Sequence, residues 1–174
     1  MTIRKILTEP DPFLRQKSVN VEEVNDEIRS LMDDMLETMY NAPGIGLAAI
    51  QVGVPKRVIV IDLSKNDEKK NPFYLVNPEI LSKSRKDASY EEGCLSVPNQ
   101  FAEISRPDTC KVKYLDYEGK VKILDAKGLL ATCIQHEMDH LEGILFIDYL
   151  SKLKKSMIIK KLSKQKKTLE RIVV

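Results

Sequence analysis

The chain has 174 residues, of which 43% are hydrophobic and 31% charged, a size and composition that fit one globular domain with its own core. It lacks an apolar run near the roughly 18 residues of a membrane helix and an apolar N-terminal stretch typical of a signal peptide, and its three irregularly spaced cysteines do not form a disulfide framework. These features together predict a cytoplasmic protein with no membrane partner and a single domain over residues 1–174. The net charge of +2 is the sum of +8 over residues 151–174 and −6 over the rest, so the C-terminal part is a basic tail.

The first regular element that the pattern predicts is an amphipathic helix at residues 25–40. Hydrophobic residues recur there every three or four positions, the spacing of a stripe that faces a core: Ile28, Leu31, Met32, Met35, Leu36 and Met39. Residues 1–24 show little periodicity and are expected to be extended or loop. After the helix come Gly44 and Gly46, which allow either a simple turn or the close approach of a ligand to the main chain.

Strands are expected through the middle of the chain. The β-branched run at residues 57–63 is the strongest, and further strands are predicted at residues 73–81, interrupted by Asn77-Pro78, into Tyr90, and in a hairpin of residues 110–117 and 120–124. A short extended piece at residues 146–149 and a helix at about residues 151–171, with Ser151 as its N-cap, complete the chain. This order predicts an α+β fold, with antiparallel sheets packed around a central helix and another helix at the C-terminus.

That central helix is predicted at residues 128–143, with Asp125 as N-cap and Gly143 just past its end. It carries the only two histidines, His136 and His140, which lie one helical turn apart and therefore on the same face. Two imidazoles at this spacing can bind one metal ion, and Glu137 beside them can handle the proton of a water molecule at that ion. The surrounding residues are mostly apolar, so the helix is expected to be buried, where such side chains need partners.

Two histidines leave a catalytic metal site one protein ligand short. Downstream, the candidates are Glu142, which points away from the histidine face, Asp148, which requires the chain to double back, and Glu170 in the basic tail. Upstream, Cys94 is a soft ligand in a segment flanked by glycine and proline. The other two cysteines, Cys110 and Cys133, are interpreted as small packing residues.

Three stretches together resemble the signature motifs of the peptide deformylase family of bacterial type, in that family's order. They are GIGLAAIQ at residues 44–51, EGCLS at residues 92–96 and QHEMDH at residues 135–140. The pattern of a single H-E-x-x-H is weakly specific, whereas all three motifs in order are highly specific. The resemblance extends over roughly residues 3–165, and the motifs show no departure from the family's pattern.

The resemblance implies a metal-dependent hydrolase that removes the N-formyl group from the N-terminal formylmethionine of new polypeptides and releases formate. The implied ligands of one divalent ion, natively Fe²⁺ with Zn²⁺, Ni²⁺ or Co²⁺ able to replace it, are Cys94, His136 and His140. The implied catalytic groups are Glu137 for proton transfer and, for the oxyanion, the Gln51 side chain and the Leu95 backbone N–H. The implied substrate-binding residues are Ile45, Gly46, Tyr90, Glu92, Gly93, Leu129, Thr132 and Cys133, with Glu92 also orienting its neighbours.

The basic tail is open to two interpretations. Its lysines can form the solvated face of a helix that packs one side on the domain, or they can dock on ribosomal RNA, where formylated chains emerge. The resemblance favours the second interpretation.

Two other functions remain open on the sequence alone. A metalloprotease of the H-E-x-x-H type would cut internal peptide bonds, but it lacks a good downstream ligand. A ribosome- or RNA-binding module with a structural metal would need a fourth protein ligand, and no residue is an obvious candidate.

Overall fold

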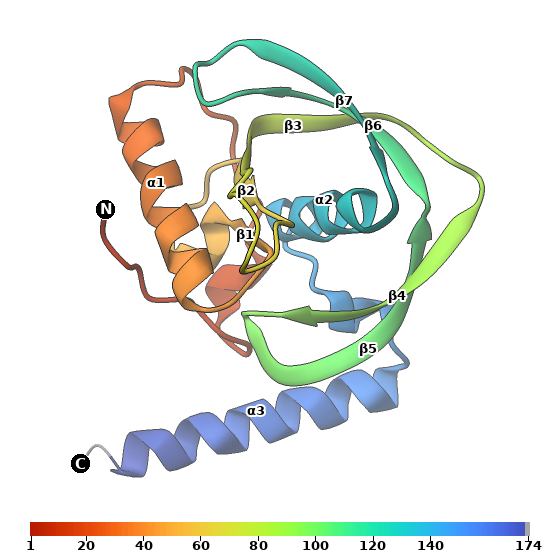
Figure 1. The fold of residues 1–174 in the computed structure, drawn as a ribbon. Helices are drawn as coiled ribbons and strands as arrows, with labels where there is room; N and C mark the ends of the chain where they lie inside the picture. Colours follow the sequence, from red (N-terminus) through yellow and green to blue (C-terminus); the bar gives the residue numbers. More distant parts are fainter. Residues whose placement is uncertain (173–174) are drawn as a thin grey trace.

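The computed structural model describes residues 1–172 (Figure 1). Its α-helices are α1 (Asp26–Asn41), α2 (Gly128–Leu141) and α3 (Lys152–Ile172), and three short 3-10 helices are η1 (Pro12–Arg15), η2 (Ala49–Val52) and η3 (Phe146–Tyr149). None of the helices in the described range combines the length and apolarity needed to cross a membrane.

The strands form two antiparallel sheets. The larger sheet has five strands in the order β1 (Gly46–Ala48), β2 (Val58–Ile61), β3 (Phe73–Lys83), β6 (Thr109–Leu115) and β7 (Val121–Lys127). The smaller sheet pairs β4 (Asp87–Cys94) with β5 (Val97–Pro107). Figure 1 shows the strands curving around α2, which lies near the centre of the molecule. The predicted α+β fold, with antiparallel sheets around a central helix and a C-terminal helix, is confirmed.

Helix α1 forms where the hydrophobic spacing predicts it. The Asn25 side chain accepts a hydrogen bond from the Ile28 backbone N–H at 3.0 Å, which satisfies one of the free donors at the helix start. The buried face of the helix carries Met32, Met35 and Met39 and packs with residues of β1 and β2 in one part of the core. This packing holds the glycine-containing segment that follows α1 against the centre of the molecule.

Helix α2 begins at Gly128, as the sequence predicts, but its N-cap is not the predicted residue. Asp125 was expected as N-cap, but it lies within β7, opposite Lys111 of β6, and the strand continues to Lys127. The chain turns directly from strand to helix at Gly128, whose φ of +57° is a conformation that glycine adopts readily. At the other end Gly143 takes a φ of +75°, as expected for a residue just past a helix.

Two further expectations about local structure are wrong. Residues 146–149 form the 3-10 helix η3 rather than an extended piece, because Leu145, Phe146 and Ile147 turn inward into a third part of the core. The sequence does not predict strand β5, because its N-terminal half lacks apolar alternation and its outward-facing residues mix the apolar Phe101 with polar ones. It forms against β4, which supplies all of its pairing partners within residues 1–172.

Helix α3 lies along the outside of the molecule (Figure 1). The Ser151 hydroxyl accepts a hydrogen bond from the Lys154 backbone N–H at 3.3 Å, in agreement with the predicted N-cap. Ile158, Ile159 and Leu162 contact the core around β5 and η3, and Leu162 is the one fully buried residue of the described helix. Most of the surface of α3 therefore faces solvent.

Candidate metal centre

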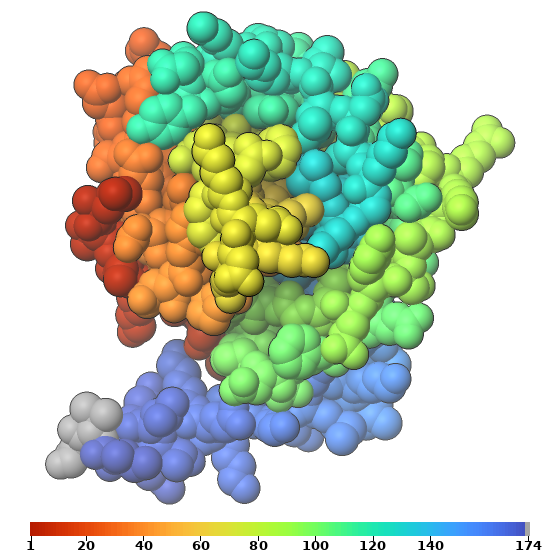
Figure 2. Space-filling view, viewed as in Figure 1, coloured from red at the N-terminus to blue at the C-terminus, as the bar shows by residue number. Residues whose placement is uncertain are grey.

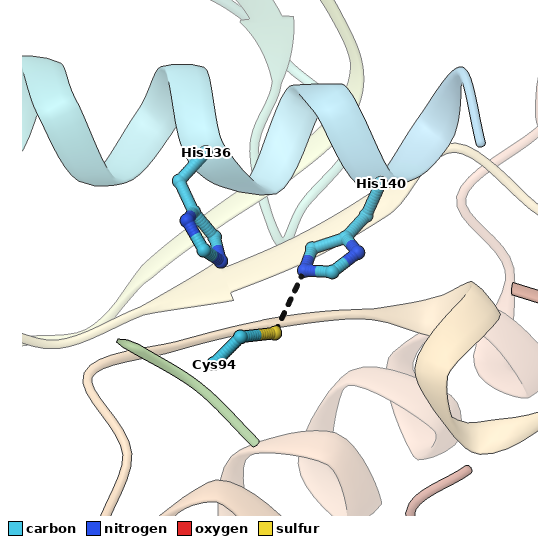
Figure 3. Close-up of side chains that lie close together, drawn as sticks. All are labelled: Cys94, His136 and His140. Carbon is cyan, nitrogen blue, oxygen red and sulfur yellow. Dashed lines mark hydrogen bonds between the residues drawn. The ribbon is translucent and has the colours of Figure 1, made fainter. Parts of the chain in front are cut away.

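The two histidines of α2 and the cysteine at the end of β4 converge on one point (Figure 3). His136 and His140 project from the same face of the helix toward Cys94, and the Cys94 Sγ lies 3.3 Å from the His140 Nε2. One ligand atom from each of the three residues lies within 4.8 Å of the other two. Both histidines are buried and Cys94 is half-buried, so the cluster lies inside the molecule rather than on its surface.

The chemistry of this donor set fits a divalent transition metal. A thiolate and two imidazoles are ligands that such ions share, and three protein ligands leave a position for a water molecule or substrate. Burial and the neighbouring His136 lower the pKa of His140 well below its usual value, which leaves the ring neutral, the form that binds metals. Within residues 1–172, this is the one cluster of three such side chains that could hold an ion.

The other candidates for the third ligand are engaged elsewhere. The Glu142 carboxylate pairs with Arg57 at 2.6 Å, and Asp148 pairs with Arg15 at 2.6 Å and with Lys155 at 2.7 Å. Glu170 is exposed on α3. Cys110 is buried in the core between the large sheet and α2, as expected of a packing residue.

A chain of buried ionic contacts holds His136 in place. The Glu92 carboxylate lies 2.7 Å from the His136 Nδ1 and accepts two hydrogen bonds from Arg106, at 2.7 and 3.1 Å. Arg106 also donates to Asp139, which accepts a further bond from the Tyr149 hydroxyl at 2.7 Å. Although burial alone raises the pKa of Glu92, the hydrogen bonds from His136 and Arg106 lower it below its usual value. The carboxylate is thus charged and fixes the ring orientation of His136.

Sequence reasoning anticipated Glu92 in this chain of contacts but missed Arg106, Asp139 and Tyr149. A signal existed in the third motif, since Asp139 lies directly before His140. Arg106 carries no such signal, because it lies on an inward-facing position of β5, a strand that the sequence did not reveal.

Glu137 is buried on α2, directly after His136. One of its oxygens lies against Gly46: a Cβ added at this glycine would be 2.5 Å from the Glu137 Oε1, so a larger residue does not fit there. The other oxygen is buried with no hydrogen-bond partner within residues 1–172, an arrangement that costs energy unless something polar meets it in the site. Burial raises the pKa of Glu137 to about 7.

Gln51 is held in a defined orientation. Its side-chain oxygen accepts a hydrogen bond from the Ala48 backbone N–H at 2.9 Å, which directs the amide nitrogen toward the site. That nitrogen donates to the Ser96 hydroxyl at 3.0 Å and lies 3.6 Å from the Cys94 Sγ. An N–H donor is therefore fixed beside the candidate ligand.

A cavity of about 580 Å³ opens beside the cluster. In Figure 2 the surface is hollowed between the cyan of α2 and the green of β4 and β5. The expected site residues that line the cavity are Ile45, Gly46, Gln51, Tyr90, Glu92, Gly93, Cys94, Leu95, Leu129, Thr132, Cys133, His136 and Glu137. His140 is fully buried and is not among the lining residues. Sequence reasoning missed the contribution of β5 to the wall, from Val97 to Phe101, because it did not predict the strand.

Comparisons with known proteins agree with this geometry. A family model described as polypeptide deformylase matches residues 3–156. Over the full length of both chains, this chain is 68% identical to a peptide deformylase of Pelagibacter ubique, and it is 62% identical to one of Phenylobacterium zucineum, with 96% of this chain and 99% of that protein covered.

Solved structures give the same result. A crystal structure of peptide deformylase from Ehrlichia chaffeensis is 44% identical, with a TM-score of 0.91 and coverage of 96% of this chain and 98% of that chain. A structure of the Ehrlichia chaffeensis enzyme in complex with actinonin is 45% identical, also with a TM-score of 0.91, and covers 95% of this chain and 98% of that one.

Proposed function

Since the chain belongs to the polypeptide deformylase family, whose members are metal-dependent hydrolases, we propose a role for each of its site residues in that family's reaction. The chain removes the N-formyl group from the formylmethionine of nascent polypeptides and releases formate. The observation that carries the proposed roles is the convergence of Cys94, His136 and His140 on one point, beside Glu137 and a cavity.

Cys94, His136 and His140 would hold the divalent ion. When bound there, the ion supplies positive charge that makes water more acidic and polarises the formyl carbonyl. Fe²⁺ is the native ion in this proposal, and Zn²⁺, Ni²⁺ or Co²⁺ can take its place, since thiolate and imidazole suit all of them. Glu92, itself fixed by Arg106, holds the orientation of the His136 ring, which would bind the ion.

Glu137 moves the proton. Its carboxylate accepts a proton from the attacking water, whose oxygen forms a bond to the formyl carbon. As the bond between that carbon and the methionine nitrogen breaks, Glu137 returns the proton to the nitrogen, so that the products are formate and a free amine. The buried oxygen of Glu137 that has no hydrogen-bond partner within residues 1–172 supports this role, because no other group there satisfies it.

Gln51 and Leu95 stabilise the charge that develops on the formyl oxygen. The Gln51 amide nitrogen is already aimed at the site through the bond that Ala48 donates to the side-chain oxygen. Leu95 follows Cys94 in the turn between β4 and β5, so its backbone N–H is available at the same point. Donors fixed before the reaction stabilise the transition state without paying for reorganisation.

The peptide lies extended between two strand edges. Within residues 1–172, β1 pairs with β2 alone and β4 pairs with β5 alone, and residues of both β1 and β4 line the cavity. The main chain of Ile45, Gly46 and Gly93 can therefore hydrogen-bond to an added strand. The methionine side chain enters the pocket formed by Ile45, Tyr90, Leu129, Thr132, Cys133 and His136.

The basic helix α3 places the enzyme at the ribosome, and the enzyme is cytoplasmic. Seven of the eight lysines of residues 152–167 are exposed, and Lys155 alone is half-buried. The family model ends at residue 156, so most of α3 lies beyond the residues that it matches. The whole chain is proposed to form one domain, with α3 as an appendage that binds ribosomal RNA through its phosphates.

Formate release tests the function directly. The purified protein should hydrolyse N-formyl-Met-Ala-Ser, should stop when a chelator removes the ion, and should resume when Fe²⁺ or Ni²⁺ is returned. Casein should remain intact, and its cleavage would instead indicate a protease. Actinonin, which the Ehrlichia chaffeensis relative binds, should inhibit the reaction, and its failure to do so would count against the proposed site.

A further inference from the structure

A second cavity, of about 320 Å³, lies against a different face of α2 from the one that carries the two histidines. The rest of its wall comes from β3 of the larger sheet, from the end of β5 and from η3. The α2 residues in the wall are three or four positions apart and so share one side of the helix: Gln135, Met138, Asp139 and Glu142. None of the groups with a role in the proposed reaction lines this cavity.

Arg106 borders the second cavity and is only 4% exposed. Glu92 accepts hydrogen bonds from its Nε at 2.7 Å and its Nη2 at 3.1 Å, and Asp139 accepts one from its Nη1 at 2.8 Å. The Tyr149 oxygen lies 3.5 Å from the same Nη1, at the limit of a hydrogen bond. A guanidinium has five N–H groups, so a buried cation with at least one N–H free within residues 1–172 lies in the cavity wall.

The charges of this wall do not cancel. It carries three cationic side chains, those of Arg57, Lys83 and Arg106, and two carboxylates. The Glu142 carboxylate pairs with Arg57 at 2.6 Å and the Asp139 carboxylate with Arg106 at 2.8 Å. Lys83 forms no ion pair within residues 1–172, so one positive charge is left over. A cleft with a surplus of one sign of charge attracts ions of the opposite sign.

The remaining surface can hold a hydrocarbon group. Ile80, Pro107 and Met138 line the cavity and are half-buried, so part of each side chain or ring is open to an occupant. Small-molecule sites in proteins have volumes of about 300–1,000 Å³, and this cavity is near the lower end of that range. Its occupant is therefore small, partly apolar and, because a single charge is unmatched, a monoanion.

We propose that the second cavity is a binding site for a short organic carboxylate. The carboxylate faces Lys83 and the free N–H of Arg106, and the hydrocarbon chain lies against Ile80 and Met138. Arg106 also fixes Glu92, which orients His136, so the occupant touches the same chain of ionic contacts as the metal centre without entering the peptide cavity. The site is independent of the function proposed above.

Hexanoate is the probe, and the methyl group of Met138 is the reporter. The chain has six methionines, of which Met138 alone lines the second cavity and none lines the peptide cavity. In the metal-loaded protein with ¹³C-labelled methionine methyl groups, hexanoate should shift the Met138 signal and saturate in about the millimolar range, as expected of so small a ligand. The variant Met138→Leu identifies that signal by its loss.

Two comparisons separate this site from other ways of binding a carboxylate. Hexylamine has the same chain with a positive charge, and it should bind at least about tenfold more weakly if the surplus charge selects the ligand. The shift caused by hexanoate should be the same with and without actinonin, the ligand of the Ehrlichia chaffeensis relative, because the peptide cavity and the second cavity have no lining residue in common.

Variants of Lys83 test the charge. Lys83→Gln should lower the affinity for hexanoate about two- to fivefold, the value of an exposed charge pair, and Lys83→Glu should lower it further, by about tenfold or more. The matched control is Lys113→Gln on β6, an exposed lysine outside the lining of the cavity, which should leave the affinity unchanged.

The absence of a saturable Met138 shift would overturn the proposal, and so would an equal response to hexylamine or an unchanged affinity in Lys83→Glu. A shift that disappears when actinonin is bound would place hexanoate at the metal ion instead, which also contradicts a separate site. Formate release from a formyl peptide has no part in these measurements, so a failure of the proposed function would be seen independently.

Discussion

Helices α2 and α3 are built for opposite environments. Nine of the fourteen residues of α2 are buried, among them both histidines and Glu137, whereas one residue of the twenty-one in α3 is buried. A helix that is enclosed on most sides can hold polar groups at fixed positions and away from water, which is what metal binding and proton transfer need. A helix that packs along a narrow stripe keeps its charges in solvent, where they can meet a large, charged partner.

The two helices therefore keep the proposed chemistry of α2 apart from the proposed ribosome binding of α3. Changes in or around α2 should affect the reaction with little effect on partners, and changes on the exposed face of α3 should do the reverse. The predictions below test this separation, and an activity loss caused by the surface of α3 would break it.

The largest effect is expected from Glu137→Gln. The variant keeps the size of the side chain but cannot accept the proton, so turnover should fall about 10²–10⁴-fold, the usual contribution of general acid–base catalysis. Metal content, measured by elemental analysis, and the circular dichroism spectrum should be unchanged. Near-full formate release by a metal-loaded Glu137→Gln protein would remove Glu137 from the reaction.

Cys94→Ala should lower metal affinity by more than about 100-fold. Loss of a residue that only orients a ligand typically costs about 10–100-fold in affinity, and loss of the ligand itself should cost more. Cys110→Ala is the matched control, because that thiol is buried in the core and should leave metal binding intact. Titration with a competing chelator measures both. Equal affinity of the two variants would place the third ligand elsewhere.

Arg106→Met should affect both stability and metal binding. It leaves Glu92 and Asp139 without their shared cation, and breaking a buried ion pair costs about 3–5 kcal/mol. His136 then loses the fixed carboxylate, so metal affinity should fall about 10–100-fold. The two effects separate in denaturant unfolding with and without added metal. If metal affinity is unchanged in the folded variant, Arg106 serves stability alone.

Replacing Lys160, Lys161, Lys164, Lys166 and Lys167 with glutamine should weaken ribosome binding, while kcat/KM for a short formyl peptide changes less than about twofold. These side chains are exposed and make no contact with the cavity. The logarithm of the binding constant should fall with the logarithm of salt concentration by about 0.7–0.9 per phosphate contact, and the variant should show a shallower slope.

Co-sedimentation with ribosomes at several salt concentrations measures that slope. The control is replacement of Lys86, Lys111, Lys113, Lys120 and Lys122, which carry the same charge but lie on the large sheet or near it. If both variants sediment like the unchanged protein, α3 is a solvated helix and nothing more.

The smallest effect concerns the point where α3 joins the body. Burial alone raises the pKa of Asp148, but hydrogen bonds from Lys155 and Arg15 lower it below its usual value. A carboxyl with a lowered folded pKa contributes stability that is present above its unfolded pKa near 3.9 and is lost as the pH falls through the folded value. Unfolding of Asp148→Asn should therefore depend less steeply on pH below about 4 than unfolding of the unchanged protein, and equal slopes would contradict this origin.

Local patterns in the sequence were sufficient to predict the elements that are determined by residues close together along the chain. The stripe of α1, the strand around Val58–Ile61, the hairpin of β6 and β7 and the Ser151 cap all depend on spacings of two to four residues, and each is present in the structure. The same holds for the placement of both histidines on one face, because four residues make about one helical turn.

The sequence by itself thus determined the fold class, the family and the three motifs, because each motif carries its chemistry in a few adjacent residues. Only the tertiary structure decided that Cys94 lies within 4.8 Å of two histidines more than forty residues away, and that Arg106 connects Glu92 to Asp139. It also decided that Phe101 lies over Gly93. These contacts depend on the pairing of β4 with β5 and on how that hairpin packs against α2, and no local periodicity records which distant residues a folded chain brings together.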